Sequence, residues 1–138
     1  LGLPLIVKPS KQGSTVGLTL VRREEDIAAA VARAAEHDDE VLLERFVPGR
    51  ELTVGVLFFN DTATTEIYTV GELYDYEAKY TAGMAHETFP ADLSLEATTT
   101  IQTLARRAFA ALKLRGYARI DFRMAPDGTF WCLEANTN

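Results

Sequence analysis

Four polar side chains near the end of the sequence have the types and the spacing needed for phosphate chemistry. Arg119 lies two residues before Asp121, and Glu134 lies two residues before Asn136. Residues two apart in a β-strand point to the same face, so each pair can present both of its members to one site. Two carboxylates and an amide suit magnesium, which keeps several waters and takes few protein carboxylates, and a neighbouring guanidinium suits a phosphate. These residues therefore predict a site that holds magnesium against phosphate groups.

A hairpin must bring the two pairs together. Alternating side chains predict strands over residues 117–124 and 129–136, joined by a turn that contains Pro, Asp and Gly. If Met124 opposes Thr129, the four polar side chains fall on one face, whereas a slip by one residue puts Asp121 on the other face. The alternative is a solvated sheet face with cross-strand ion pairs, which the apolar neighbours of these residues disfavour.

A loop near the start has the composition of a phosphate-binding loop. Within residues 8–17, glycines flank Ser14 and Thr15, so backbone N–H groups and hydroxyls can donate to phosphate oxygens. The spacing is not that of the helix-opening P-loop, and a flexible hairpin loop with a solvated Lys8 explains the same residues. Residues 1–23 carry bases and no acid, the bases being Lys8, Lys11, Arg22 and Arg23. This local charge indicates a small anionic ligand, unless the bases merely solvate a strand end.

The segment after a predicted strand over residues 41–45 is a candidate nucleotide slot. Residues 44–47 lead into a joint at residues 47–49, where Pro and Gly punctuate the chain. A strand end at such a joint can offer backbone groups to a purine edge, and Glu51 can accept hydrogen bonds from ribose hydroxyls. A bare strand end with a β-turn explains the same residues.

A long irregular segment occupies residues 71–90. It contains Tyr74, Tyr76 and Tyr80 together with Lys79, and it has neither helical nor strand periodicity. An irregular segment of this length in a compact domain is more often functional than idle. We interpret it as a lid that carries a cation to a reacting phosphate, and the alternative is a surface aromatic loop.

The remaining periodicities predict two helices and five further strands. The first helix begins near Glu24, where acids favour a helix N-terminus, and its apolar residues are Ile27, Ala28, Val31, Ala34 and Ala35. The second runs from its N-cap Ser94 to Lys113. Its apolar stripe comprises Leu95, Ile101, Leu104, Ala105, Ala108, Phe109 and Leu112. The strands are predicted over residues 5–8, 17–21, 41–45, 51–59 and 62–70.

The composition bounds the class of protein. The chain has 138 residues, of which 47% are apolar and 25% charged, with 14 bases and 20 acids giving a net charge of −6. This balance is typical of a folded globular chain and disfavours binding to nucleic acid. No apolar run approaches the roughly 18–20 residues that span a bilayer. The single cysteine, Cys132, which we expect to be buried beside Trp131, excludes an internal disulfide and a multi-cysteine zinc site.

Taken in order, five stretches closely resemble the D-alanine–D-alanine ligases of the ATP-grasp superfamily. They are IVKPSKQGSTVG (6–17), LLERFVPGRELTVGV (42–56), YDYEAKY (74–80), GYARIDF (116–122) and LEANTN (133–138). The resemblance implies an α+β chain with the ATP-grasp fold, in which two α/β lobes with antiparallel sheets clasp a nucleotide. Residues 1–47 would be part of the central lobe, and residues 48–138 part of the C-terminal lobe with a lid loop at 71–90. We therefore expect a truncated piece of a longer protein.

The resemblance also implies an activity, the ATP-dependent ligation of two D-alanine molecules through an acyl phosphate to give D-alanyl-D-alanine for peptidoglycan synthesis. The substrates would be D-alanine and ATP, the cofactor two Mg²⁺ ions or Mn²⁺, and the setting the cytoplasm, with no nucleic-acid or membrane partner. A homodimer of the full-length protein is left open. The alternatives are another ATP-grasp carboxylate–amine ligase, or a nucleotide-binding module only, which is the expected limit of the chain on its own.

The resemblance implies roles for the residues of this sequence that match the family's motifs. Catalytic roles fall to Arg119, Lys79, Tyr80 and Tyr76. Nucleotide-binding roles fall to Lys8, Ser14, Thr15, Glu44, Arg45, Phe46, Val47 and Glu51. Metal-ligating roles fall to Asp121, Glu134 and Asn136.

Two departures from the family's pattern are visible. Residues 58–69 resemble translated sequencing-adapter sequence, although their β-forming threonines still predict a strand that pairs with residues 51–59. Arg45 and Phe46 stand where the family commonly has Lys and Trp, which is a mild change for a slot read largely by backbone groups.

Overall fold

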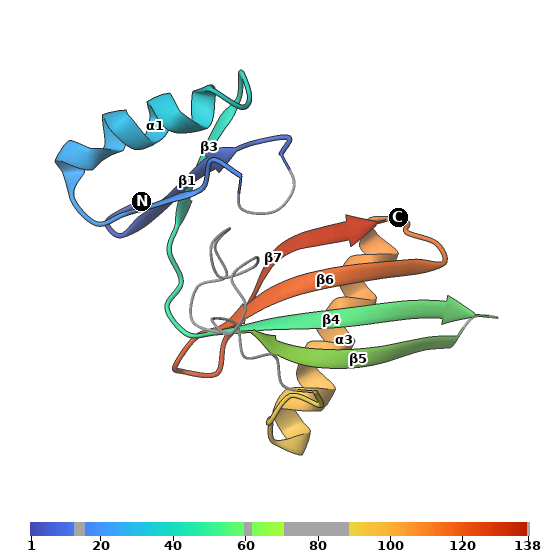
Figure 1. Cartoon of the computed structure of the whole chain (residues 1–138). Helices are drawn as coiled ribbons and strands as arrows, with labels where there is room; N and C mark the ends of the chain where they lie inside the picture. The colour runs from blue at the N-terminus through green and yellow to red at the C-terminus, as the bar shows by residue number, and fades with distance from the viewer. Residues whose placement is uncertain (13–15, 60–61, 71–88, 138) are drawn as a thin grey trace. The chain divides into compact units, whose positions relative to one another are not determined.

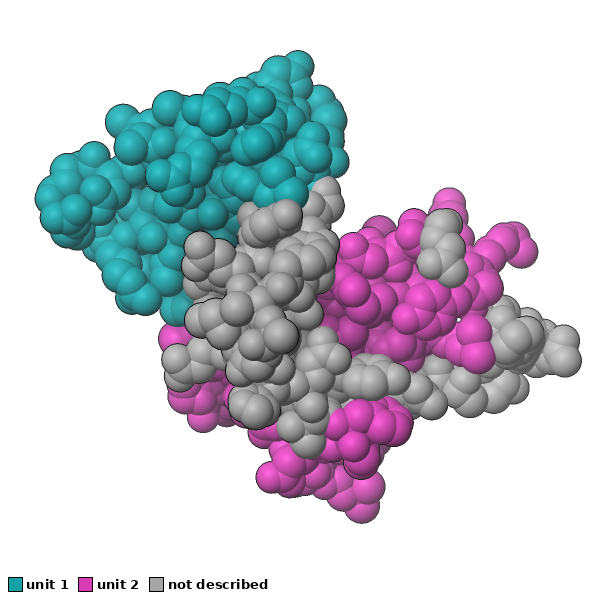
Figure 2. Space-filling view, in the orientation of Figure 1, with its two compact units in different colours: residues 1–47, 74–84 teal, residues 48–73, 85–138 magenta. Residues whose placement is uncertain are grey.

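The computed structural model describes residues 1–12, 16–59, 62–70 and 89–137. These residues fall into two compact units, the first ending at Val47 and the second beginning at Pro48 (Figure 2). Each unit contains its own antiparallel sheet and its own helix. Separate antiparallel sheets with packed helices make this an α+β fold, as the sequence predicts. The assignment of the units to two ATP-grasp lobes stays a prediction.

The first unit is a three-stranded sheet covered by one helix (Figure 1). Its strands are β1 (Leu5–Pro9), β2 (Thr19–Val21) and β3 (Val41–Arg45), in the order β2-β1-β3 with every neighbour antiparallel. A 3₁₀ turn over Glu24–Asp26 precedes α1 (Ile27–Ala35). The core consists of Leu5, Val7, Val21, Ala30 and Ala34, against which Ile27, Val31 and Val41 pack. Ala28 and Ala35, both placed on the apolar stripe by spacing, are exposed.

The second unit is a four-stranded sheet with a long helix along one face (Figure 1). Its strands are β4 (Arg50–Phe59), β5 (Thr62–Val70), β6 (Tyr117–Met124) and β7 (Phe130–Thr137), in the order β5-β4-β6-β7. The helix α3 spans Leu95–Ala111, and its N-cap Ser94 accepts a hydrogen bond from the amide of Ala97 at 3.2 Å, as predicted. The predicted hairpin of residues 51–59 with 62–70 also forms, as β4 with β5.

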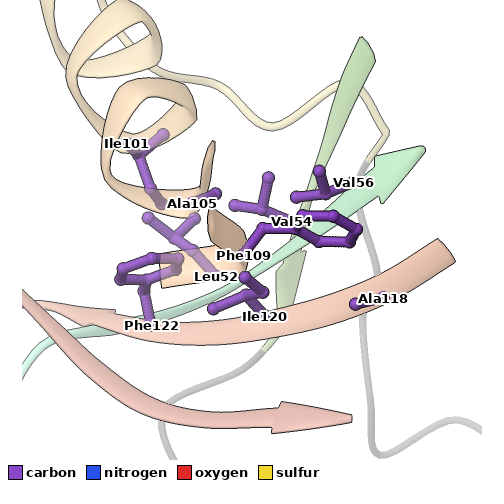
Figure 3. Packing of buried hydrophobic residues seen from close by; sticks show 9 residues of the cluster. All are labelled: Leu52, Val54, Val56, Ile101, Ala105, Phe109, Ala118, Ile120 and Phe122. Carbon is purple, nitrogen blue, oxygen red and sulfur yellow. The ribbon is translucent and has the colours of Figure 1, made fainter. Parts of the chain in front are cut away.

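One face of the second sheet and one stripe of α3 form a single core (Figure 3). Strand β4 contributes Leu52, Val54 and Val56, strand β6 contributes Ala118, Ile120 and Phe122, and α3 contributes Ile101, Ala105 and Phe109. Because strand side chains alternate, the residues between these, Thr53 on β4 and Arg119, Asp121 and Arg123 on β6, must occupy the opposite face. The burial that holds the unit together therefore leaves a polar face for chemistry.

Two residues of the predicted α3 stripe lie outside this core. Leu95 is 83% exposed and Leu112 is 56% exposed. Leu95 is the first residue of the helix and Leu112 is its C-cap, so both lie beyond the turns that pack on the sheet.

Within the described residues, no helix is long and apolar enough to cross a membrane.

A single glycine allows the chain to enter β4 at the start of the second unit. Gly49 has a φ of +129°, which residues other than glycine rarely adopt. A Cβ at this position would also overlap the carbonyl oxygen of Met124. Arg50 and Met124 form the first pair of the β4–β6 ladder. The glycine therefore permits the close approach with which that ladder begins.

Gly49→Ala should destabilise the second unit. The strained backbone alone costs about 1–3 kcal/mol, and the overlap with Met124 adds to it. The matched control is Gly128→Ala, because Gly128 also has positive φ, +84°, but no atom lies within 4 Å of its added Cβ. Urea unfolding followed by the fluorescence of Trp131 measures both variants. Equal losses would show that the approach to Met124 is not the constraint.

Candidate functional site

The carboxylate of Asp121 is the centre of the polar face of the second unit. Asp121 is 6% exposed, and donors from three strands reach its two oxygens. Oδ1 accepts from Thr53 Oγ1 of β4 at 2.9 Å and from Arg119 Nε of β6 at 3.1 Å. Oδ2 accepts from Arg119 Nη2 at 3.0 Å and from Asn136 Nδ2 of β7 at 3.1 Å. The carboxylate is therefore held in one orientation by side chains from β4, β6 and β7.

The pairing of β6 with β7 differs from the predicted register. Met124 opposes Phe130 and not Thr129, which is a slip by one residue. Between Phe122 and Asp121 the register shifts once more, so that Phe122 opposes Cys132 while Asp121 opposes Glu134. This β-bulge shifts the register by one further residue of β7. The total shift from the predicted register is then two residues, after which side chains return to the same face of a strand. The predicted pairing is wrong, yet the bulge returns the polar residues to one face.

The two acids of the site converge on a common point. The same atom, Asn136 Nδ2, donates to Asp121 Oδ2 at 3.1 Å and to Glu134 Oε1 at 3.0 Å. Arg119 Nη2 also lies 3.9 Å from Glu134 Oε1. Two carboxylates that one atom can bridge are also within reach of a single small cation. The structure therefore brings together all four residues predicted at this site.

This donor set fits a hard divalent cation. Across the residues that the structure describes, no three His, Cys, Asp or Glu side chains form a metal-holding group, so two carboxylates and an amide are the available protein ligands. Magnesium takes few carboxylates and keeps waters, whereas structural zinc sites need Cys or His in closed sets. The amide would have to turn its oxygen toward the ion, because it now presents its nitrogen to the acids.

Burial and charge oppose each other at this site. Burial raises the pKa of Asp121 above its ordinary value, and the attraction of Arg119 and the hydrogen bond from Thr53 reduce that rise without cancelling it. Burial acts to lower the pKa of Arg119, but the charges of Asp121 and Glu134 outweigh it, so that the pKa is raised. Two acids and one guanidinium leave an excess of one negative charge. That balance favours an added cation.

Sequence reasoning missed Thr53. It lies directly opposite Asp121 in the β4–β6 ladder, and its hydroxyl is the donor from β4. The pairing joins residues 68 apart in the sequence, which no local pattern indicates. Aligning the alternation of residues 50–57 against 117–124 is the signal that could have found it.

Glu51, the predicted ribose acceptor, also lies on β4 and forms an ion pair. Its register partner on β6 is Arg123, and Arg123 Nη2 lies 2.6 Å from Glu51 Oε2. The side chains are 5% exposed for Arg123 and 16% for Glu51. Arg123 Nη1 also donates to the carbonyl oxygen of Gly49 at 3.4 Å. Glu51 is therefore oriented by a guanidinium from the neighbouring strand.

In the first unit, acids outside residues 1–23 offset the basic opening. Lys8 Nζ lies 3.0 Å from Glu44 Oε1, which brings together two predicted nucleotide-binding residues. Lys11 Nζ lies 3.2 Å from Asp39, 3.4 Å from Glu40 and 3.6 Å from Asp38. Arg23 pairs with Glu25 and Asp26. The excess positive charge predicted for residues 1–23 is therefore largely balanced in the folded unit.

Part of the predicted purine slot is already paired. The amide of Phe46 donates to the carbonyl oxygen of Pro4 at 3.2 Å, which extends the β1–β3 ladder beyond its last residue pair. Arg45 Nε donates to the carbonyl oxygen of Leu1 at 3.3 Å. A purine edge at residues 44–47 would therefore have to use backbone groups other than the Phe46 amide.

Several predicted site residues lie outside the described residues. They are Ser14, Thr15, Tyr76, Lys79 and Tyr80. Cys132, which the sequence led us to expect in the interior, is exposed. It follows the solvent-facing Trp131 at the β-bulge, where β7 departs from regular alternation. Burial of part of the thiol and the charge of Asp121 raise its pKa, which disfavours a nucleophilic thiolate.

Comparison with protein families and curated proteins gives concordant results. The family model described as "D-ala D-ala ligase C-terminus" matches residues 1–138. A D-alanine–D-alanine ligase of Pelobacter propionicus is 44% identical over 136 residues, which cover 99% of this chain and 44% of that protein. A D-alanine–D-alanine ligase of Bordetella petrii is 46% identical over 142 residues and is likewise covered over 44% of its length. The chain thus spans less than half the length of these relatives.

Solved structures with similar folds bear related names. The VanG D-Ala:D-Ser ligase of Enterococcus faecalis superposes with a TM-score of 0.87 at 32% identity, covering 99% of this chain and 41% of that one. The D-alanyl-alanine synthetase A of Vibrio cholerae superposes with a TM-score of 0.79 at 35% identity, covering 96% and 42%.

Thr53→Val should lower the free energy of unfolding by about 1–3 kcal/mol. The variant keeps the shape of the side chain but removes a hydrogen bond to a buried, charged carboxylate. Thr53→Ser keeps the hydroxyl and is the matched control, with a smaller expected loss. Urea unfolding followed by Trp131 fluorescence compares the two. If Thr53→Val, which keeps the methyl group, loses no stability, the bond to Asp121 does not stabilise the unit.

Asp38 should stabilise the first unit in a pH-dependent way. Its carboxylate accepts from the amide of Glu40 at 3.1 Å and from the amide of Lys11 at 2.6 Å. These bonds, the Glu40 bond first, lower the pKa of Asp38 to about 2. The pKa of an aspartate in an unfolded chain is about 3.9. The stabilisation is therefore complete above that pH and is lost as the pH falls toward 2.

The difference in stability between the parent chain and Asp38→Asn should therefore be largest near pH 6 and should shrink between pH 4 and 2. Far-UV circular dichroism during urea unfolding at several pH values measures it. Glu36→Gln is the control, because Glu36 is exposed at the end of α1. A difference that stays constant down to pH 2 would contradict the assignment.

Proposed function

Because the chain belongs to the D-alanine–D-alanine ligase family and matches its C-terminal part, we propose that it forms much of the nucleotide- and metal-binding region of an ATP-dependent D-alanine–D-alanine ligase. The observation that carries the proposal is the convergence of Arg119, Asp121, Glu134 and Asn136 in a chain that matches the family over its whole length. Ligases of this family use ATP and a divalent metal ion, and the reaction belongs to peptidoglycan synthesis.

The proposed reaction has two steps. The carboxylate of one D-alanine takes the γ-phosphoryl group of ATP, which gives an acyl phosphate and ADP. The amine of a second D-alanine then attacks the acyl carbon, and phosphate leaves as the peptide bond forms. A free carboxylate is a poor acyl donor, so phosphorylation supplies the leaving group. Catalysis in both steps depends mainly on positioning and on neutralisation of charge.

The polar face of the second unit suits the transferred group. We assign Asp121, Glu134 and Asn136 as ligands of magnesium, with two ions as the proposed number and Mn²⁺ as a substitute. When bound, the metal neutralises phosphate charge. Arg119, whose pKa lies above its ordinary value, stays charged and is assigned to the oxyanion of the acyl phosphate and of the tetrahedral intermediate.

The remaining roles rest on the family resemblance and on positions in each unit taken separately. Lys8 is assigned to the α- and β-phosphates, residues 44–47 to the adenine, and Glu51 to the ribose. The other assignments are Ser14 and Thr15 to phosphate closure, Lys79 to the γ-phosphate, and Tyr76 and Tyr80 to the acceptor side. Because the proposed reaction consumes ATP, we assign the protein to the cytoplasm.

A second candidate differs in the acceptor. The VanG structure, which superposes over 99% of this chain, is named for a D-Ala:D-Ser ligase. The same metal and phosphate residues would serve ligation to D-serine, because both acceptors attack the same acyl phosphate. The acceptor is therefore the part of the proposal that an assay must decide.

A chimeric ligase tests the function directly. This chain replaces the matching 136 residues of the Pelobacter propionicus ligase, and phosphate release is measured with ATP, Mg²⁺ and D-alanine alone or with D-serine added. We expect D-alanine-dependent phosphate release and a D-alanyl-D-alanine product. A folded chimera that binds ATP but releases no phosphate with either acceptor overturns the proposal.

Asp121→Asn in this chimera should reduce turnover by about 100-fold or more while changing the Kd of ATP far less. Loss of one anionic ligand weakens stabilisation of the transferring phosphoryl group, and several kcal/mol of barrier correspond to such a factor. Steady-state kinetics and nucleotide titration measure the two effects. Asp127→Asn, in the exposed β6–β7 turn, is the control. Unchanged turnover would remove Asp121 from the metal site.

A further inference from the structure

We propose that Arg123 is a positioning residue for the sugar of the nucleotide, because it holds the Glu51 carboxylate in the orientation that accepts ribose hydroxyls. The inference rests on the ribose-binding role proposed above for Glu51. It goes further in naming a residue to which neither the sequence motifs nor the proposed reaction assigns a part.

The geometry of the pair is unusually constrained for two long side chains. Glu51 and Arg123 are register partners on neighbouring strands, and Nη2 lies 2.6 Å from Oε2. The Arg123 side chain is only 5% exposed, and Nη1 reaches the carbonyl oxygen of Gly49 at 3.4 Å. The guanidinium is thus fixed between a strand backbone and a carboxylate. A glutamate anchored in this way loses most of its rotamer freedom before any ligand arrives.

The carboxylate remains able to bind a ligand while it is paired. Glu51 keeps 16% of its side chain exposed, compared with 5% for Arg123. A carboxylate has about four lone-pair positions, so it can accept from a guanidinium and from a hydroxyl at the same time. Arg123 would therefore raise affinity for the ribose hydroxyls by preorganising their acceptor.

A purely structural role predicts something different. A buried ion pair between β4 and β6 can simply join the strands, and removal of either partner then destabilises the unit. That effect weakens binding of every nucleotide alike. Loss of a positioning residue instead weakens the binding only of nucleotides that carry the ribose hydroxyls. The preference for ATP over a nucleotide without these hydroxyls therefore distinguishes a positioning role from a structural one.

The test compares binding of ATP and of 2′,3′-dideoxy-ATP to the chimeric ligase by calorimetry, with the ratio of their Kd values as the readout. The parent should favour ATP by about tenfold or more, the range expected for hydrogen bonds to a charged group. Arg123→Met should reduce this ratio to about 2, mainly by weakening the binding of ATP. Arg123→Lys, which keeps the charge but loses the planar fork, should give an intermediate ratio. Arg107→Met, on the exposed side of α3, should leave the ratio unchanged.

Each outcome has a separate meaning. If Arg123→Met or Arg123→Lys weakens both nucleotides equally, Arg123 is structural and the inference is overturned. Should Arg123→Met fail to fold, as thermal unfolding would show, the ratio for Arg123→Lys decides. Glu51→Gln is measured in parallel and should bring the ratio close to 1. A full ratio in Glu51→Gln would refute the ribose role of Glu51 itself, whereas a collapsed ratio there with a full ratio in both Arg123 variants refutes only the part given to Arg123.

Discussion

The burial of one carboxylate is the constraint on which the second unit depends. Asp121 lies in the middle of β6 with 6% of its surface exposed, and an ionised group in that position is costly unless donors surround it. Thr53, Arg119 and Asn136 provide those donors, each from a different strand. The site therefore forms only if β4, β6 and β7 pair in one register. Stability of the sheet and geometry of the site are set by the same contacts.

The β-bulge in β7 shows how closely the site depends on register. Without the extra residue, the pairing near the turn would continue and would place Glu134 opposite Ile120 and Asn136 opposite Ala118, on the face that packs against α3. With it, Glu134 lies opposite Asp121 and Asn136 lies opposite Arg119. A local irregularity thus corrects the slip imposed by the turn. Bulges are often found beside functional sites because they re-aim side chains in this way.

Local signals predicted much of this fold, and contacts between distant segments account for what they missed. The Ser94 cap and the strand alternation of residues 117–124 depend on near neighbours, and both are confirmed. The donor Thr53 depends on a pairing across 68 residues, and the bulge depends on the fit of two strands. The extent to which the charge of residues 1–23 is offset could not be predicted for the same reason, since acids from residues 38–44 approach Lys8 and Lys11 only after folding. Local motifs in the sequence were enough to identify the candidate site residues. The side chains that pair with those residues are set by contacts between segments that are distant in the sequence.

Under the proposed function, the polar face of β4 and β6 presents its groups in the order of the parts of a nucleotide. Along the two strands, the Glu51–Arg123 pair comes first, the Thr53–Asp121 pair second, and Arg119 opposite Gly55 third. Successive pairs on one face are about 7 Å apart, since each strand residue advances about 3.4 Å. Under the proposed function, these rows correspond to the sugar, the metal-bound phosphates and the transferred group. The alternation that buries Leu52, Val54 and Val56 against α3 fixes this spacing on the other face. A rigid ladder can therefore set the distance between the group that binds the sugar and the groups that act at phosphorus.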